Sequence, residues 1–370
     1  MHNLHRALSA FVVGVIPLVC VAGYLAFTIA SRSTSLIPFS LGLEPTERLL
    51  MKDLQQLAKI TDVDNFAQFD YNLEDVERHY SATTFRDYRL LEFLTGCNAM
   101  HTDLVPAQKL PFAAKHLKQL MYVMMNMPHN RPMRTASGNV LEVGFGKGSN
   151  SIFLRALKPS GVRFFGVDVL PAHVQYAKKY AANLGFVDNV EFHLGDASNM
   201  PAAITTNTYD LIFGIESFCY LDTDDSVEAF LNFASKSLTS GGKIVIVDGF
   251  RADDFETFSA DVRRAMELAE SGFRIRRMAS KATWKKLSEQ HGRFVVREDV
   301  DLTSEAFPFW RKWWRFAHLL LRFAPSLVRK YLEKGGERTE TFANFVSVCM
   351  TSYAMALGSA KYGVLVLEKV

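Results

Sequence analysis

Three glycines at alternate positions after a short apolar run constrain the fold of this chain more than any other feature. Residues 140–148 read VLEVGFGKG, with Glu142 near the end of the run and glycines at Gly144, Gly146 and Gly148. The segment SIFLRALK that follows them favours a helix. A strand, a glycine turn and a helix in this order bring a nucleotide-like ligand against bare backbone, because glycine tolerates positive φ and has no Cβ.

Strands and helices alternate after this glycine turn. Four apolar runs predict further strands, and in chain order they read FFGVDV, NVEFHLGDA, YDLIFGIES and KIVIVDGF. Two amphipathic segments between them, residues 171–185 and 226–238, predict helices with one apolar stripe each. Such alternation is typical of a parallel sheet that carries helices on both faces and binds its ligand at the carboxyl ends of the strands.

Acidic residues end three of the predicted strands. Asp168 ends the second strand, 24 residues after Gly144, where an acid can hold both hydroxyls of a ribose. Asp196 and Glu216 end the third and fourth strands. A dinucleotide-binding domain is the alternative. That domain usually shows G-x-G-x-x-G with an apolar residue at the position of Glu142, and it has no standard task for the third-strand acid.

The order E-x-G-x-G-x-G, an acid after strand two, G-D-A after strand three and then Y-D-x-I-x-x-I-E-S resembles the class I S-adenosylmethionine-dependent methyltransferases. The resemblance begins near residue 78, reaches the C-terminus and is densest over 138–250. It implies an α/β fold with a Rossmann-like, doubly wound, seven-stranded sheet, a helical N-terminal cap and a C-terminal lid insertion. It also implies S-adenosyl-L-methionine as the cofactor and no metal.

The same resemblance implies a cofactor site. In it the three glycines line the methionine part, Asp168 binds the ribose hydroxyls, and Asp196 with Ala197 flanks the adenine. Glu142 would organise the glycine loop and face the methionine ammonium. The implied cofactor-binding residues are Glu142, Gly144, Gly146, Gly148, Asp168, Val169, Asp196, Ala197, Ile215 and Tyr80.

Two segments outside the core show a narrower resemblance. Residues 79–101 look like the N-terminal cap of tocopherol, sterol and cyclopropane-type lipid methyltransferases, with Tyr80 and Tyr88 placed to close over the cofactor. Residues 292–310 look like the strand, D-x-T and P-F-W of the same subfamily. This resemblance implies a lipophilic small-molecule acceptor. One departure stands out: relatives often carry a His shortly after the acid that here is Glu216, and this chain continues Ser-Phe-Cys-Tyr.

Three residues are candidates for catalysis in an in-line displacement of the sulfonium methyl group. Glu216, His101 and Tyr220 could act as a general base or stabilise positive charge on the acceptor. Each also has a purely structural alternative. Glu216 could hold a nearby backbone amide, His101 could be an ordinary cap-helix histidine, and Tyr220 could serve packing alone.

The N-terminus predicts a membrane anchor. Residues 7–30 carry no charge and lie between Arg6 and Arg32, and about 20 apolar residues suffice for a helix to span a bilayer. A cleavable signal peptide is the alternative, although its apolar region is usually shorter. Because S-adenosylmethionine is made in the cytosol, we expect a single-pass membrane protein with its catalytic domain on the cytosolic side.

Aromatic and basic side chains are interleaved at residues 307–330. This segment contains six positive charges and no acid, and it includes Trp310, Trp313 and Trp314. Such a helix suits the headgroup level of a bilayer, and a lid helix packed on the core is the alternative. Nucleic acid is not an expected partner, because the net charge is only +3 and no recognisable binding module surrounds the patch.

These observations predict a layout with an anchor at 1–32, a linker and helical cap at 33–130, the Rossmann-like core at 131–303, lid helices at 304–361 and a final strand of the sheet at 362–370. Within the cap, a stripe of Leu117, Leu120, Met121 and Met124 is expected to face the core. The four cysteines show no C-x-x-C spacing, so neither a zinc site nor a disulfide framework is expected.

The sequence therefore predicts a methyltransferase that acts on a lipophilic small molecule at a membrane. Two alternatives from other classes remain open at this point. One is a nicotinamide-dependent oxidoreductase with a Rossmann domain, and the other is a membrane-tethered, inactive methyltransferase-like protein. The oligomeric state does not follow from the sequence.

Overall fold

A computed structural model describes most of the chain after residue 42. The described residues are 43–67, 73–80, 101–102, 104, 117–127, 138–157, 161–290, 293–333 and 337–370. Pro45–Val370 form one compact unit. The predicted anchor at 7–30 lies outside the described residues, as does Tyr88. Among those that are described, no helix is both long and apolar enough to cross a bilayer.

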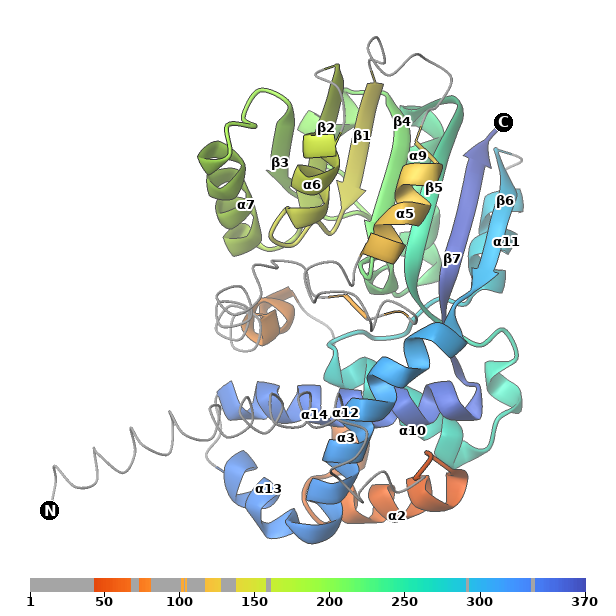
Figure 1. Ribbon diagram of the computed structural model, residues 1–370. Coiled ribbons are helices and arrows are strands. Elements are labelled where there is room, and N and C mark those ends of the chain that lie inside the picture. The colour runs from red at the N-terminus through yellow and green to blue at the C-terminus, as the bar shows by residue number, and fades with distance from the viewer. Residues whose placement is uncertain are drawn as a thin grey trace, which may run out of the picture. The chain divides into compact units, whose positions relative to one another are not determined.

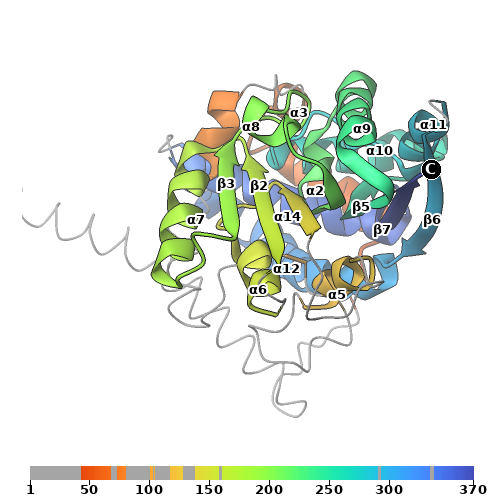
Figure 2. The ribbon, with the colours of Figure 1, turned by 90° about the horizontal axis from the view of Figure 1, so that it is seen from above.

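Within the described residues, seven strands form one sheet in the order β3-β2-β1-β4-β5-β7-β6 (Figures 1 and 2). The strands β1 to β5 run parallel, and β7 lies antiparallel between β5 and β6. The predicted seven-stranded, doubly wound sheet is thereby confirmed. The strands are β1 (Gly138–Val143), β2 (Val162–Asp168), β3 (Val190–Leu194), β4 (Tyr209–Ile215), β5 (Leu238–Arg251), β6 (Phe294–Asp301) and β7 (Ala360–Lys369).

Helices cover both faces of this sheet, and the chain changes face between β3 and β4. On one side lie α5 (Leu117–Met125), α6 (Ser149–Leu157) and α7 (Pro171–Asn183). On the other lie α8 (Ala202–Thr205), α9 (Asp224–Ser237) and α11 (Lys281–Gln290). Because the strand order reverses at this change of face, β1 and β4 are neighbours, and a doubly wound sheet opens its ligand crevice at such a switch point.

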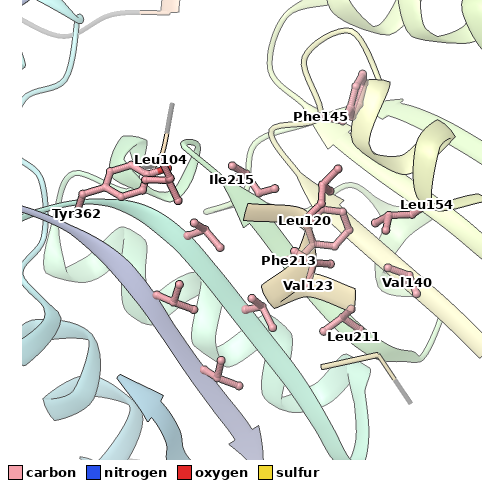
Figure 3. Close-up of a cluster of buried hydrophobic side chains, with 14 of the residues drawn as sticks. Leu104, Leu120, Val123, Val140, Phe145, Leu154, Leu211, Phe213, Ile215 and Tyr362 are labelled. Carbon is pink, nitrogen blue, oxygen red and sulfur yellow. The ribbon is translucent and has the colours of Figure 1, made fainter. Parts of the chain in front are cut away.

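Side chains alternate between the two hydrophobic cores along each central strand. Leu211 and Phe213 of β4 face the helix α5, while Ile212 between them faces the α9 side. Figure 3 shows Leu120 and Val123 of α5 against the first of these faces. The predicted stripe on α5 is partly wrong. Met121 is 54% exposed, because the buried stripe runs through Leu120, Val123 and Met127 instead.

A second layer of helices lies beyond the carboxyl ends of the parallel strands (Figure 1). In it α10 packs along α14, and α12 packs against both α14 and α2. Helices therefore occupy the region expected to form the lid. The layer consists of α2 (Glu47–Ala58), α3 (Val63–Ala67), α10 (Ala260–Gly272), α12 (Thr303–Phe323), α13 (Pro325–Leu332) and α14 (Glu337–Leu357).

A buried carboxylate joins three helices of this layer. Asp53 of α2 accepts hydrogen bonds from Nδ1 of His318 on α12 at 2.8 Å and from the hydroxyl of Tyr353 on α14 at 2.7 Å. The indole of Trp314 stacks on the His318 ring with 5.2 Å between centroids. Trp314 is fully buried, so this tryptophan of the 307–330 segment is part of the core and cannot reach a bilayer.

We predict that Asp53→Ala lowers the free energy of unfolding by about 3 kcal/mol, because His318 and Tyr353 would remain buried without their shared acceptor. Tyr353→Phe removes only one of the two hydrogen bonds and should cost about 1.5 kcal/mol. Denaturant unfolding followed by circular dichroism measures both values. A smaller loss for Asp53→Ala than for Tyr353→Phe would show that the carboxylate does not join the three helices.

Candidate functional site

A cavity of about 590 Å³ lies where the carboxyl ends of the parallel strands meet the second helical layer. The loops after β1, β2, β3 and β4 form one wall, and side chains of α10, α12 and α14 form the other. The sequence-predicted residues that line it are Tyr80, His101, Gly144, Gly146, Asp168, Val169, Asp196, Ala197, Ile215, Glu216 and Tyr220. Glu142 and Gly148 are not among the lining residues.

The three glycines of the loop have positive φ but different surroundings. A Cβ added at Gly148 would lie 2.7 Å from the ring of Phe192 and 2.9 Å from Cβ of Ala177, so this glycine permits packing of the loop on β3 and α7. A Cβ at Gly144 would collide with Ser217 at 2.3 Å. A Cβ at Gly146 would meet nothing within 4 Å and would stand in the cavity. Gly146 is therefore the position at which a ligand can approach the bare backbone.

Glu142 lies behind the glycine loop and holds the start of the helix that follows it. Its Oε1 accepts a hydrogen bond from the amide nitrogen of Asn150 at 2.9 Å. Its Oε2 accepts from the backbone N–H of Ser151 at 3.1 Å and from the hydroxyl of Ser151. These bonds tie β1 to the first turn of α6. Burial raises the pKa of Glu142 to about 7, although the donors from Asn150 and Ser151 oppose that rise.

Asp168 fixes the other side of the loop. Its Oδ2 accepts a hydrogen bond from the backbone N–H of Gly146 at 2.9 Å, and its Oδ1 accepts from the N–H of Leu170, also at 2.9 Å. Nδ1 of His173 lies 3.1 Å from Oδ1. Asp196 in the next loop accepts from the N–H and hydroxyl of Ser198 through Oδ1. The two carboxylates therefore face one cavity from neighbouring strand ends.

These residues fit the expected cofactor. An open glycine at Gly146, a carboxylate at Asp168 and a second one at Asp196 line one continuous wall, which suits methionine, ribose and adenine in that order along the wall. When bound there, S-adenosylmethionine would supply an activated methyl group. Within the described part of the chain, no group of three or more His, Cys, Asp or Glu side chains could hold a metal ion.

Glu216 directly follows β4 in a strained conformation, and it lines the cavity. Its φ is +54°, a value that a non-glycine residue adopts at an energetic cost. Oε1 accepts hydrogen bonds from the backbone N–H of Thr102 at 2.8 Å and from the hydroxyl of Tyr362 at 2.7 Å. Burial and the charge of Glu216 raise the pKa of Tyr362 well above its usual value, so this phenol remains a donor. The carboxylate is thereby fixed in position.

His101 lies between the two acids of β1 and β4. Its Nε2 is 3.2 Å from the amide nitrogen of Asn150, which also donates to Glu142. The same ring nitrogen lies 3.4 Å from Oδ1 of Asn150, and Nδ1 faces Oε2 of Glu216 at 3.9 Å. Burial lowers the pKa of His101 more than the charge of Glu216 raises it, so the ring is neutral near pH 7.

The hydroxyl of Tyr220 is already committed to two hydrogen bonds. It donates to the carbonyl of Phe273 at 2.9 Å and lies 2.7 Å from the hydroxyl of Tyr80, which must then be the donor. The Tyr80 ring lies edge-on to His173, the partner of Asp168, with 5.8 Å between centroids. This pair of phenols therefore joins the helical residues 73–80 to the cavity, and neither proton is available to an acceptor.

Sequence reasoning missed several residues that position the site. Asn150 and His173 each lie in the first turn of a helix that begins beside the site, and a buried polar residue at such a place is a usable signal. Thr102 and Tyr362 are far from Glu216 in the chain and contact it only because the cap and β7 close around β4. No spacing in the sequence indicates that contact.

We predict that alanine at Gly148 mainly lowers stability, whereas alanine at Gly146 mainly weakens cofactor binding. Gly148→Ala should lower the free energy of unfolding by at least about 2 kcal/mol, because its Cβ collides with Phe192 and its φ is positive. Gly146→Ala should cost only about 1 kcal/mol of backbone strain but weaken S-adenosylhomocysteine binding at least tenfold. Thermal unfolding and calorimetric titration measure the two effects. Equal cofactor affinity in Gly146→Ala and the parent protein would place the cofactor elsewhere.

Comparisons with known proteins found a family match for the part of the chain that carries the glycine loop and the strand-end acids. Residues 134–295 match the family described as Methyltransferase domain. A relative with a similar sequence is erythromycin 3''-O-methyltransferase from Saccharopolyspora erythraea, which is 33% identical over 30% of this chain and 34% of the relative. The chain thus spans about a third of the length of this curated relative.

Solved structures share the fold at lower identity. Geranyl diphosphate C-methyltransferase from Streptomyces coelicolor A3(2) superimposes with a TM-score of 0.58 at 15% identity, over 80% of this chain and 97% of the other. A cyclopropane synthase from Mycobacterium tuberculosis gives a TM-score of 0.62 at 13% identity, over 81% and 99%. The expected resemblance is confirmed, and it favours a methyltransferase over the dinucleotide-binding alternative. Residues 134–295 of this chain therefore match a methyltransferase domain, and the solved structures with this fold include S-adenosylmethionine-dependent enzymes.

Proposed function

We propose that this protein transfers the methyl group of S-adenosylmethionine to a lipophilic small molecule at a membrane. The observation that carries the proposal is the position of Glu216. Its fixed carboxylate lies on the wall of the same cavity as the open glycine Gly146, and the opposite wall is largely apolar. A methyl donor on one side and an apolar acceptor on the other would meet at this carboxylate.

The acceptor half of the cavity is built from side chains of the second helical layer. Met266 and Phe273 come from α10 and the turn after it, Trp310 comes from α12, and Met355 comes from α14. The rings of Phe273 and Trp310 lie edge-on with 6.0 Å between centroids. Thioethers and aromatic faces bind hydrocarbon surfaces with few directional demands, so this half suits a lipophilic molecule better than a sugar or a free amino acid.

Glu216 is the residue of this chain best placed to assist the transfer. An electron pair of the acceptor forms a bond to the methyl carbon while the carbon–sulfur bond breaks, so the positive charge of the sulfonium passes to the acceptor. The carboxylate of Glu216 can neutralise that charge or accept the proton that the acceptor then loses. Thr102 and Tyr362 hold the first oxygen of this carboxylate through hydrogen bonds, and the neutral ring of His101 faces the second at 3.9 Å.

Two other functions receive less support. A nicotinamide-dependent oxidoreductase would need no acid at Asp196, and the family match is to a methyltransferase domain. An inactive relative would have no need of a fixed, strained Glu216 or of an open Gly146. Two proteins with a similar fold are named geranyl diphosphate C-methyltransferase and cyclopropane synthase. Both names refer to molecules with hydrocarbon chains or rings, which agrees with an apolar acceptor.

A membrane location is part of the proposal and rests on the sequence. The uncharged residues 7–30 would anchor the chain in a single pass, with the catalytic domain in the cytosol where the cofactor is made. An acceptor that dissolves in the bilayer would then be concentrated beside the cavity. The anchor also explains why an apolar cavity could work on molecules that are poorly soluble in water.

We predict that Glu216→Gln lowers kcat for methyl transfer about 100-fold or more, because the amide keeps both hydrogen bonds to Thr102 and Tyr362 but loses the charge. Transfer is measured with methyl-labelled S-adenosylmethionine and a membrane lipid extract as the source of acceptor. The affinity for S-adenosylhomocysteine should change less than about threefold, since the proposed cofactor contacts lie on the loops after β1, β2 and β3.

Tyr220→Phe is the matched control for this experiment. Its hydroxyl bonds to Tyr80 and to the Phe273 carbonyl, both groups of the protein itself, so the variant should retain kcat within about tenfold. Titration of the parent protein with S-adenosylhomocysteine and, separately, with NAD tests the reaction class. Binding of NAD in preference to S-adenosylhomocysteine would overturn the proposed function, and full activity of Glu216→Gln would overturn the role of that residue alone.

We predict that the full-length protein stays in the membrane pellet after carbonate extraction, because a spanning helix resists alkaline release where a peripheral protein does not. Mass spectrometry of the N-terminus distinguishes the alternative. Recovery of a mature chain that lacks residues 1–30 would show that this segment is a cleaved signal peptide.

A further inference from the structure

We infer that the outer face of α12 and α13 binds the surface of an anionic bilayer. We define this outer face by its exposed apolar residues Phe316, Leu319, Phe323 and Leu327 and by the exposed basic residues Arg322, Arg329 and Lys330. The inference goes beyond the proposed function, because it concerns a surface outside the cavity and holds for any acceptor.

The exposure of four large apolar side chains is the first observation. Phe323 is 74% exposed, Leu327 61%, Phe316 45% and Leu319 36%. The spacing of positions 316, 319 and 323 puts their side chains on one face of α12. The buried residues Trp314 and Leu321 lie on the opposite face, so α12 has one apolar stripe in the core and a second one in solvent. An exposed apolar stripe of this kind marks an interaction site.

The charge around this outer face is the second observation. Between residues 306 and 332 the chain carries six Lys and Arg residues and no Asp or Glu. Long basic side chains beside an apolar stripe can place their stems on the hydrocarbon and their charged ends among phosphates. The outer face therefore combines the two features that an anionic bilayer surface attracts, apolar area and positive charge.

The charge pattern also decides between possible occupants. A second copy docked through the same face would bring Arg322, Arg329 and Lys330 against their own counterparts, which is electrostatically unfavourable. The N-terminal segment of this chain is no better complement, since residues 1–43 contain no acid and include Arg6 and Arg32. A bilayer with anionic lipids supplies both the negative charge and the hydrocarbon that these two occupants lack.

The outer face belongs to the same helix that closes the acceptor half of the cavity. Trp310 on α12 lines the cavity, and Phe316 begins the outer face less than two turns further along that helix. A bilayer that contacts the outer face would therefore lie beside the apolar wall. This position differs from the one predicted from sequence alone, in which Trp314 was to be an interfacial residue.

Site-specific photocrosslinking of the full-length protein in vesicles tests the inference. A benzoylphenylalanine residue is placed at Phe323 and, as a matched control, at Val187, which is 57% exposed and precedes β3 at the opposite end of the sheet. The vesicles contain phosphatidylcholine with or without phosphatidylserine. We expect lipid adducts at 323, at least fivefold more than at 187, with a higher yield when phosphatidylserine is present.

Charge reversal on the outer face isolates the electrostatic part. The triple variant Arg322→Glu, Arg329→Glu and Lys330→Glu should lower the lipid adduct at 323 at least about fivefold in phosphatidylserine vesicles, since each basic residue near an anionic surface strengthens binding by about that factor. The matched control reverses three exposed lysines elsewhere, Lys178→Glu, Lys179→Glu and Lys236→Glu, and should leave the adduct unchanged.

Several outcomes would overturn the inference. Equal adducts at 323 and 187 would mean that the outer face has no preferred contact with lipid. A crosslinked dimer would show that a second copy covers the face, and an adduct with a peptide from residues 1–42 would show that the chain covers it itself. Because the readout is a lipid adduct at one position, it does not depend on methyl transfer or on cofactor binding.

Discussion

The pairing of β1 with β4 is the constraint on which the rest of the structure depends. Val140 and Leu211 are partners in this parallel ladder, and so are Glu142 and Phe213. Parallel neighbours end at the same edge of a sheet, so the glycine loop after β1 and Glu216 after β4 must meet. The cavity opens at this edge, and the helices that follow β5 and β6 form its other wall.

Once the two strand ends meet, a chain of polar contacts fixes their relation. Glu142 holds Asn150, Asn150 contacts His101, and His101 faces Glu216. The acid that organises the cofactor loop is thus linked to the acid that faces the acceptor by two intervening side chains. Removal of one member would leave buried polar groups without partners, which costs more than each bond contributes by itself.

The strands and the strand-end carboxylates could be predicted from the sequence, but the distant residues that contact these carboxylates could not. Apolar runs and the glycine spacing predicted the strands, and strand-end acids placed Asp168, Asp196 and Glu216 on one cavity. Contacts between distant segments, such as Tyr362 with Glu216, leave no local pattern, so they could not be predicted. The two sides of α12 were confused for a related reason. Both are apolar, and only the packing of Trp314 against His318 and Tyr353 decides which side is buried.

Two buried carboxyl groups near the cavity, Glu142 and Asp248, respond to the charge of the expected ligand. Burial raises the pKa of Glu142 to about 7 and, with the charge of Glu216, that of Asp248 to about 7. Asp248 holds the turn after Glu216 through the N–H groups of Ser217 and Cys219. Since both folded-state pKa values exceed the ordinary carboxyl value, the stability that these two groups contribute is greatest at acid pH, below the ordinary value, and is lost as the pH rises through about 7.

A cation bound beside them favours the ionised forms and opposes that loss. S-adenosylmethionine carries a sulfonium charge and its demethylated product does not, so the same carboxyl groups that cost stability near neutral pH favour the donor over the product.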